Sequence, residues 1–425
     1  MTTPASTSGG PAPAAAREAV RAELRVWLAE RWDPELALVE WRTRLVAAGW
    51  AAPSWPRRWH GRGLPAWADD VVTEELHAHG AVGPPVGVAT GLAAPTILEH
   101  GPDTLRDRFL HPILTGRETW CQLFSEPGAG SDLAGLTTRA ELDGDEWVVT
   151  GQKVWNTSAH HADFGLLVAR SDWGAPKHRG LTYLAIPMRQ PGVVVRPLRQ
   201  MNGHASFNEV FLVDARVPSD HVIGEVGNGW AVARTTLAHE RRFGGLRPAS
   251  YGSASGRALD EARAEVLEHF APYVWYPQRA GRVDLLVERA RALGCHGDRV
   301  VRQEVARVLT LQAVSGWTAE RARANRAAGR QPGPEGSIGK LALSVVARAA
   351  ARTHSLIAGA TAMVAGTDAP LDGIVTEVLL SVPAQSIAGG TDEIQRNILG
   401  ERMLGLPREP DDDADRPFRD LPRNG

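Results

Sequence analysis

The spacing of apolar residues changes twice along this 425-residue chain, and this change constrains the fold more than any other feature. From residue 17 to 119, apolar side chains recur at helical spacing, as in Val20 and Leu24. From 120 to 228 they fall in short β-rich runs separated by turn residues, which predicts strands without intervening helices. Helical spacing returns from 229 to 406. The sequence therefore predicts a large α+β protein whose strands form an antiparallel sheet or a small barrel.

The chain ends differ from these regions. Residues 1–16 are of low complexity and carry too little apolar surface to order themselves, so we expect a disordered tail. Residues 407–425 contain an acidic run, which predicts a second, solvated tail. Strands are expected at 146–150, 164–169, 181–186, 193–195 and 209–213, and the longest later helices at 282–292, 298–328 and 337–364.

Composition excludes several classes of protein. The net charge of −2, with acidic and basic residues interleaved, gives no reason to expect nucleic acid or an anionic membrane surface as a partner. The two cysteines, Cys121 and Cys295, indicate a reducing compartment rather than a disulfide framework. No signal peptide and no apolar run of roughly 18 residues is visible, so we expect a cytoplasmic protein without a membrane span. We expect no metal site.

A glycine-rich stretch, Ser125–Asp132, joins the first helical region to the strands. Its exposed backbone N–H groups and hydroxyls suit a polar ligand, although a short glycine-rich string taken alone is more often an ordinary loop. The stretch Gly151–Thr157 follows a predicted strand and places Trp155 and Thr157 two residues apart. A second signature, Ile387–Arg402, comes near the end of the last helical region.

Together these stretches resemble the flavin-binding signatures of the acyl-CoA dehydrogenase family, and the segments 201–211 and 217–230 also resemble that family in the expected order. The resemblance covers roughly residues 20 to 407. It implies an N-terminal helical domain, a central antiparallel β domain and a C-terminal helical bundle that drives oligomerisation. It also implies non-covalent FAD bound between the β domain and the C-terminal helices, with an acyl-CoA or acyl-carrier thioester as substrate.

Residue by residue, the resemblance implies a set of cofactor-binding positions. Ser131 would also line the thioester region, and Arg241 would contact substrate. The implied electron acceptor is an electron-transfer flavoprotein or a similar protein, and the assembly is a homo-oligomer or a mixed tetramer. The implied flavin contacts are Phe124, Ser125, Gly130, Ser131, Trp155, Thr157, Thr391 and Glu393.

The general base is the position at which this chain departs from much of the family. Many members carry a glutamate directly before the Gly-Thr pair, where this chain has Gly389, which can offer only its backbone N–H to the thioester carbonyl. A minority branch carries the glutamate before an arginine on a helix in mid-chain, and Glu240 stands there. On a helical wheel Glu240 lies roughly 20° from Ala233, beside an apolar stripe that partly desolvates a carboxylate. The alternative is a structural glutamate paired with a neighbouring arginine.

Two family features are missing. An Arg-x-x-Phe-Gly stretch that reaches the FAD pyrophosphate does not align with Tyr276–Asp284, and a Gln-x-x-Gly-Gly-x-Gly motif is replaced by Ile357–Gly366. The leading hypothesis is an FAD-dependent acyl-CoA dehydrogenase with Glu240 as base. The alternatives are a non-catalytic partner subunit of a heteromeric dehydrogenase and a flavin monooxygenase built on the same fold.

Overall fold

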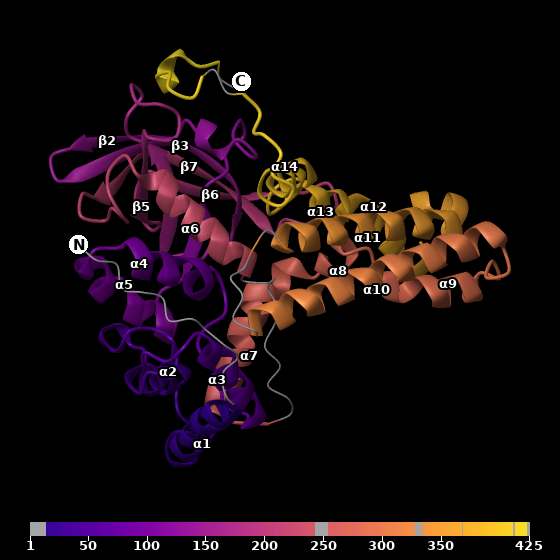
Figure 1. Ribbon diagram of the computed structural model, residues 1–425, viewed down its shortest axis with the longest axis horizontal. Helices are drawn as coiled ribbons and strands as arrows, with labels where there is room; N and C mark the ends of the chain where they lie inside the picture. The colour runs from indigo at the N-terminus through magenta and orange to yellow at the C-terminus, as the bar shows by residue number, and fades with distance from the viewer. Residues whose placement is uncertain are drawn as a thin grey trace. The chain divides into compact units, whose positions relative to one another are not determined.

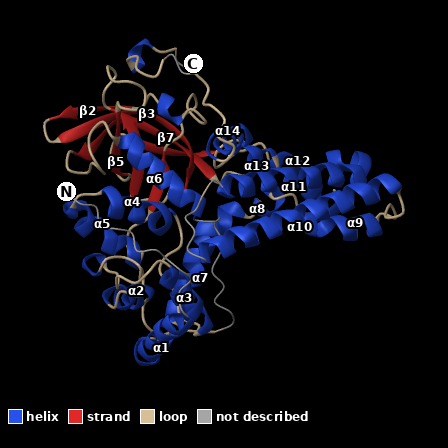
Figure 2. Cartoon of the chain, in the orientation of Figure 1, coloured by secondary structure: helices blue, strands red, loops and turns tan. Residues whose placement is uncertain are grey.

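The computed structural model describes residues 14–242, 254–327, 333, 335–367, 369–410 and 413–422, and Figures 1 and 2 show its elements. Two compact units divide the chain. The sheet unit comprises the described residues of Pro13–Arg199 and Ala205–Ala271 together with 413–422. The helical unit comprises Gln200–His204 and the described residues of Pro272–Pro410. Each unit is described by itself.

The sheet unit begins with helices whose buried faces follow the apolar spacing of the sequence. In α1 the buried residues are Val20, Leu24 and Leu28, one turn apart, as the helical spacing predicts. This helix begins at Ala14, within the segment predicted as disordered, and the rest of that segment lies outside the described residues. The helices are α1 Ala14–Arg31, α2 Leu38–Ala47, α3 Trp67–Ala78, α4 Ala94–His100 and α5 Asp103–Thr115.

A seven-stranded sheet follows, in the order β1-β4-β2-β3-β7-β6 with β5 paired to β4. All five predicted strands are present, which confirms that part of the interpretation. The pairing is antiparallel except that β1 lies parallel to β4 and β2 shares one parallel pair with β4. The strands are β1 Trp120–Leu123, β2 Arg139–Asp143, β3 Glu146–Thr157, β4 Phe164–Arg170, β5 Leu181–Pro187, β6 Val193–Leu198 and β7 Phe207–Pro218.

Two further helices, α6 (Gly229–Arg242) and α7 (Arg257–Phe270), pack within the sheet unit. The sequence groups them with the C-terminal helical domain, because helical spacing resumes at 229. In the structure α6 contacts β5 and α4, and α7 contacts α2. The reason is the buried face of α6, since Val232 and Ala233 belong to the same core cluster as strand and N-terminal helix residues.

The helical unit is built around α11, which contacts α9, α10, α12, α13 and α14. Small residues of α11, among them Ala347 and Ala350, are fully buried and allow these neighbours to approach closely. The helices of this unit are α8 Tyr276–Arg279, α9 Leu286–Ala292, α10 Arg299–Ala327, α11 Glu335–Ala358, α12 Ile374–Ser381, α13 Pro383–Ile387 and α14 Asp392–Arg402.

One stretch, Leu371–Arg402, contains an 18-residue window with a mean hydropathy of 1.2, although the sequence predicts no membrane span. The stretch is not one continuous helix, because Pro383 begins a new helix and the turn before α14 interrupts the chain again. The eight residues of α12 span only about 12 Å, against roughly 30 Å for the hydrocarbon core of a bilayer. The stretch therefore consists of several short helices rather than one continuous apolar helix.

The chain end docks on the sheet unit, so the predicted tail is not solvated throughout. Residues Phe418–Asp420 form a 3₁₀ turn, and the Phe418 side chain is buried. The amide N–H groups of Phe418 and Arg419 donate to the carbonyls of Ala175 and Trp173 at 3.0 and 3.1 Å. The acidic run that precedes Phe418 predicts a solvated tail, and it gives no sign that the Phe418 ring is buried.

Candidate functional site

The glycine-rich loop Ser125–Asp132 leaves the end of β1 in the sheet unit. Phe124 is buried and Ser125 is partly buried, whereas Gly130 and Ser131 are exposed. A Cβ placed on Gly130 would meet no atom of the described residues within 4 Å, so among them the loop presents open backbone at this point. The loop is thus buried where it begins and exposed at Gly130 and Ser131, an arrangement that lets a ligand approach the main chain.

A buried ion pair fixes this loop on β3. The Lys153 ammonium is fully buried and donates to Glu126 Oε1 at 2.9 Å and to the carbonyls of Phe124 and Val168 at 3.0 and 2.8 Å. Glu126 also accepts from the N–H groups of Thr137 and Thr138 at 2.7 and 2.9 Å. Burial alone would raise the pKa of Glu126, but the ammonium and these donors outweigh it and lower the pKa to about 2. The loop is therefore rigidly anchored at its start.

Trp155 stands at an irregularity of β3 rather than in the core. Its φ is +64°, it is 56% exposed, and the register of β3 with β7 shifts between Lys153 and Asn156. A left-handed conformation is strained for a bulky residue by roughly 1–2 kcal/mol and is commonest at functional positions. Because its indole is exposed, Trp155 is not a core aromatic. Thr157 lies two residues on and is partly buried.

The same strand connects to Glu240 through Gln122 of β1. Asn156 Nδ2 donates to the Gln122 carbonyl at 2.7 Å, and Gln122 Nε2 donates to Glu240 Oε2 at 3.4 Å. Glu240 is partly buried near the end of α6, in agreement with the helical wheel. The side chain of Arg241, the predicted substrate contact, lies outside the described residues.

Buried hydroxyl groups hold α6 in place one turn before Glu240. Thr236 is fully buried, and its Oγ1 lies 2.9 Å from both Tyr183 Oη and Thr96 Oγ1. The Tyr183 ring meets Phe124 edge to face at a centroid distance of 5.8 Å. Through Tyr183, the helix that carries Glu240 is thus in contact with Phe124, the residue directly before the glycine-rich loop.

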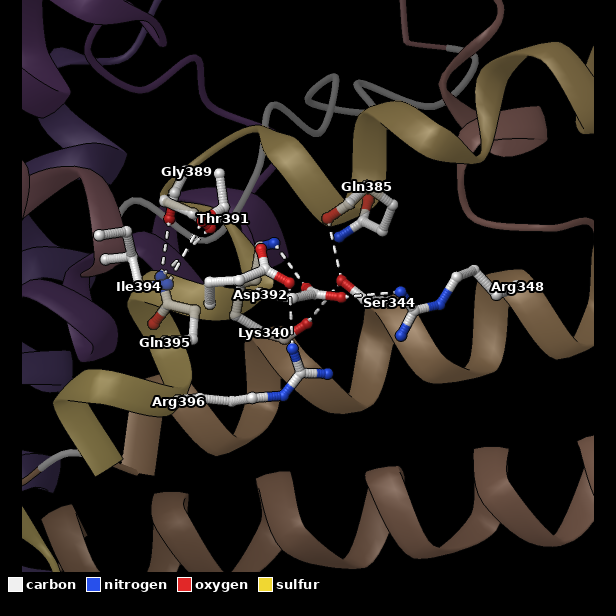
Figure 3. Close-up of polar contacts among 12 residues, drawn as sticks. Lys340, Ser344, Arg348, Gln385, Gly389, Thr391, Asp392, Ile394, Gln395 and Arg396 are labelled. Atoms are coloured by element: carbon white, nitrogen blue, oxygen red, sulfur yellow. Dashed lines mark hydrogen bonds and ion pairs between the residues drawn. The ribbon is translucent and has the colours of Figure 1, made fainter. Parts of the chain in front are cut away.

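The second signature forms a tight turn before α14 in the helical unit (Figure 3). Gly389 and Gly390 both have positive φ, +67° and +85°, a conformation that glycine adopts without strain. Gln395 Nε2 donates to the Gly389 carbonyl at 3.0 Å, and Thr391 caps α14 by accepting from Ile394 N–H at 3.3 Å.

The buried carboxylate of Asp392, the first residue of α14, anchors this turn to α11 (Figure 3). Asp392 is 1% exposed and pairs with Lys340 at 3.2 Å and Arg348 at 3.1 Å. Burial opposes its ionisation, yet hydrogen bonds from Ser344 and Lys340 and the two cations hold the pKa of Asp392 below its usual range. Glu393, by contrast, is exposed and pairs with Arg396 at 3.1 Å.

The structure therefore gathers the predicted residues into two groups. Phe124, Ser125, Gly130, Ser131, Trp155, Thr157 and Glu240 lie in the sheet unit, and Gly389, Thr391 and Glu393 lie in the helical unit. Sequence reasoning missed Gln122, Glu126, Lys153, Asp392 and Gln395. Four of these, all except Gln122, lie inside the quoted signatures, so charged and amide residues within a signature were the available signal. Among the described ranges no three His, Cys, Asp or Glu residues gather as metal ligands.

The arrangement fits a flat aromatic cofactor with polar edges. Trp155 presents an exposed indole, and the open main chain at Gly130 and the nearby hydroxyls offer hydrogen-bonding groups. These features suit the flavin half of FAD.

Comparisons with known proteins agree in domain order. The N-terminal, middle and C-terminal domain models of acyl-CoA dehydrogenases match residues 13–117, 121–215 and 280–404. Acyl-CoA dehydrogenase IpdE1 of Mycobacterium tuberculosis is 35% identical over 92% of this chain and 98% of its own length. Acyl-CoA dehydrogenase FadE34 of the same organism is 38% identical over 86% of this chain and 46% of its own length.

Solved structures are similar over nearly the whole chain. The Tcur3481-Tcur3483 steroid ACAD has a TM-score of 0.63 at 25% identity and covers 93% of this chain and 99% of its own. The ChsE4-ChsE5 complex of Mycobacterium tuberculosis has a TM-score of 0.62 at 28% identity and covers 95% of this chain and 100% of its own. The domain order, the flavin signatures and these similarities place the chain in the acyl-CoA dehydrogenase family of FAD-dependent oxidoreductases.

Proposed function

We propose that this protein catalyses the α,β-dehydrogenation of an acyl-CoA or acyl-carrier thioester, with Glu240 as the general base. The observation that carries the proposal is the placement of Glu240. It is a partly buried carboxylate on an anchored helix, within reach of Gln122 on the strand that leads into the glycine-rich loop. Gly389, at the position where many relatives carry their base, has no side chain to compete for that role.

Each residue group has a defined task in this proposal. Glu240 takes the proton from the carbon α to the thioester carbonyl. The N–H of Gly389 donates to the thioester oxygen, where negative charge develops as that proton leaves. Trp155 and Thr157 would cover the flavin ring, and Thr391 and Glu393 would complete its contacts. Bound FAD supplies the acceptor for the hydride that leaves the β carbon.

Gln122 adds a positioning role. Its amide donates to one oxygen of Glu240 at 3.4 Å, which orients the carboxylate that is proposed to accept the proton. Asn156 of β3 donates to the Gln122 carbonyl. Gln122 therefore contacts both the proposed base and the strand that carries Trp155.

Assembly and substrate rest on the relatives. Two of the similar structures are complexes of two named chains, and one is described as a steroid ACAD. We propose an oligomer, either of this chain alone or mixed with a related chain, and a bulky acyl thioester as the first substrate class to test. An electron-transfer flavoprotein as acceptor and a cytoplasmic location stay predictions of the sequence.

The decisive experiment is anaerobic flavin bleaching by acyl thioesters. Glu240→Gln keeps shape and hydrogen bonding but removes the base, so FAD should stay bound while the bleaching rate falls by about 10²–10⁴-fold. The matched control is Glu225→Gln, an exposed glutamate just before α6, which should bleach at the unmutated rate. A colourless purified protein would favour the partner-subunit alternative. Unchanged bleaching in Glu240→Gln would overturn the assignment of the base.

A further inference from the structure

The loop that follows the flavin signature is held by a buried arginine. Arg170, at the end of β4, is fully buried. Its Nη2 donates to the Ala134 carbonyl at 2.6 Å and its Nε to the Leu136 carbonyl at 3.2 Å. Both carbonyls lie directly after Ser125–Asp132. Arg170 therefore holds the chain just after the glycine-rich loop, and the Glu126–Lys153 pair holds the start of the loop.

The chain end covers this arginine. The Phe418 ring lies over the Arg170 guanidinium, with Cζ 3.4 Å from the ring centroid, and is itself 3% exposed. Trp173 packs beside it at a centroid distance of 5.6 Å. A desolvated guanidinium over an aromatic face makes a strong cation–π contact, and burial lowers the pKa of Arg170 to about 10. Phe418 therefore replaces water at a cation whose hydrogen bonds go to main-chain carbonyls.

The chain end reaches this position through its own contacts. Main-chain hydrogen bonds join Phe418 and Arg419 to Ala175 and Trp173. Arg416 pairs with Asp413 at 2.6 Å and donates to the Asp420 carbonyl at 3.0 Å. The segment is thus folded on itself as well as docked, and it is more than 240 residues from Arg170 in sequence.

We propose that residues 413–422 form a clasp that holds the glycine-rich loop in its flavin-binding form, with Phe418 and Arg170 as positioning residues. The proposal rests on the proposed function in one respect, the assignment of this loop to FAD. Without the ring, water reaches the guanidinium and competes for its bonds to Ala134 and Leu136. The loop then spends part of its time open, and the apparent dissociation constant of FAD rises in inverse proportion to the closed fraction.

The test uses the full-length protein and two readouts. Phe418→Ala should raise the FAD dissociation constant at least tenfold in flavin titrations. It should also speed amide exchange at 132–138 while exchange in the helical unit stays unchanged. The matched control is Asp415→Asn, at an exposed position of the same segment, which should match the unmutated protein in both readouts. Phe418→Tyr keeps the ring and should restore most of the affinity.

A double-mutant cycle separates positioning from general stability. If Phe418 acts through Arg170, Phe418→Ala combined with Arg170→Lys should bind FAD no more weakly than Arg170→Lys alone. Three results would each overturn the clasp. They are additive losses of FAD affinity in the double variant, unchanged amide exchange at 132–138 in Phe418→Ala, and faster amide exchange throughout the protein. The exchange measurement needs no flavin, so failure of the unmutated protein to bind FAD would count against the proposed function and leave the clasp separately testable.

Discussion

Replacement of Lys153 by methionine should destabilise the sheet unit by about 3 kcal/mol, because it removes the cation from a buried ion pair. Breaking a buried pair by removing one partner typically costs about 3–5 kcal/mol. Glu126 would keep its hydrogen bonds from Thr137 and Thr138, which favours the lower end of that range. The Phe124 and Val168 carbonyls would also lose their donor.

The pH dependence of stability gives a second route to the same magnitude. The folded pKa of Glu126 is about 2 against an ordinary value of 4.5, a difference worth about 3 kcal/mol. Because the folded pKa is depressed, this stabilisation is fully present above about pH 4.5 and is lost as pH falls towards 2. In Glu126→Gln the acid-induced loss of stability should be smaller by that amount.

Urea unfolding followed by tryptophan fluorescence would measure the single variants Lys153→Met and Glu126→Gln and their combination. The double variant should be less destabilised than the sum of the singles by about 2 kcal/mol or more, since neither charge is then left buried alone. A loss below about 1 kcal/mol in Lys153→Met, or strict additivity, would show that the pair does not hold the loop.

Three further outcomes follow from the site. Trp155→Ala should weaken FAD binding about tenfold with little change in thermal stability, because the indole is mostly exposed; the combination with Thr391→Ala should release flavin on gel filtration, and full retention would contradict the placement. Asp392→Asn should destabilise the helical unit by about 2 kcal/mol in urea, because it weakens two ion pairs at a buried site, and an unchanged midpoint would argue against that anchor. Gln395→Leu should speed amide exchange at 389–391, since the turn carbonyls lose their side-chain donor; equal exchange would show that the glycines hold the turn unaided.

The spacing of apolar residues predicted most of the helices and strands, because secondary structure depends on short-range periodicity. Strands β3 to β7 were predicted from their β-rich runs, whereas β1 and β2 were missed. In β2 only Ala140 is buried, so the strand has no apolar alternation to detect, and its pairing with β3 supplies the order. The start of α1 was placed late because three alanines carry no periodic signal.

The parts of the site that escaped prediction depend on contacts between distant residues. Lys153 and Arg170 are long cationic side chains, which pattern reasoning assigns to the surface. Their burial becomes visible only when β3 and β4 meet the loop and the chain end meets Trp173. The partial burial of Glu240 agrees with the helical wheel of α6 because that evidence is local, and the buried Thr236 one turn earlier extends the same face. The role of Glu240 as base stays a proposal.

The proposed function makes a further prediction about the glycine at 389 and the glutamate at 240. With φ of +67°, position 389 suits glycine, and a glutamate there would be strained by about 1–2 kcal/mol unless the turn rearranged. Within the part of the chain that the structure describes, space is not the obstacle, because no atom there lies within 4 Å of the place a Cβ would take. The paired change Glu240→Ala with Gly389→Glu should therefore restore part of the bleaching rate lost in Glu240→Ala, falling short of the unmutated rate by about 5- to 30-fold if the strain persists in the transition state. If the paired variant holds FAD yet bleaches no faster than Glu240→Ala, a carboxylate at 389 cannot reach the α carbon, and the two positions are not interchangeable in this chain.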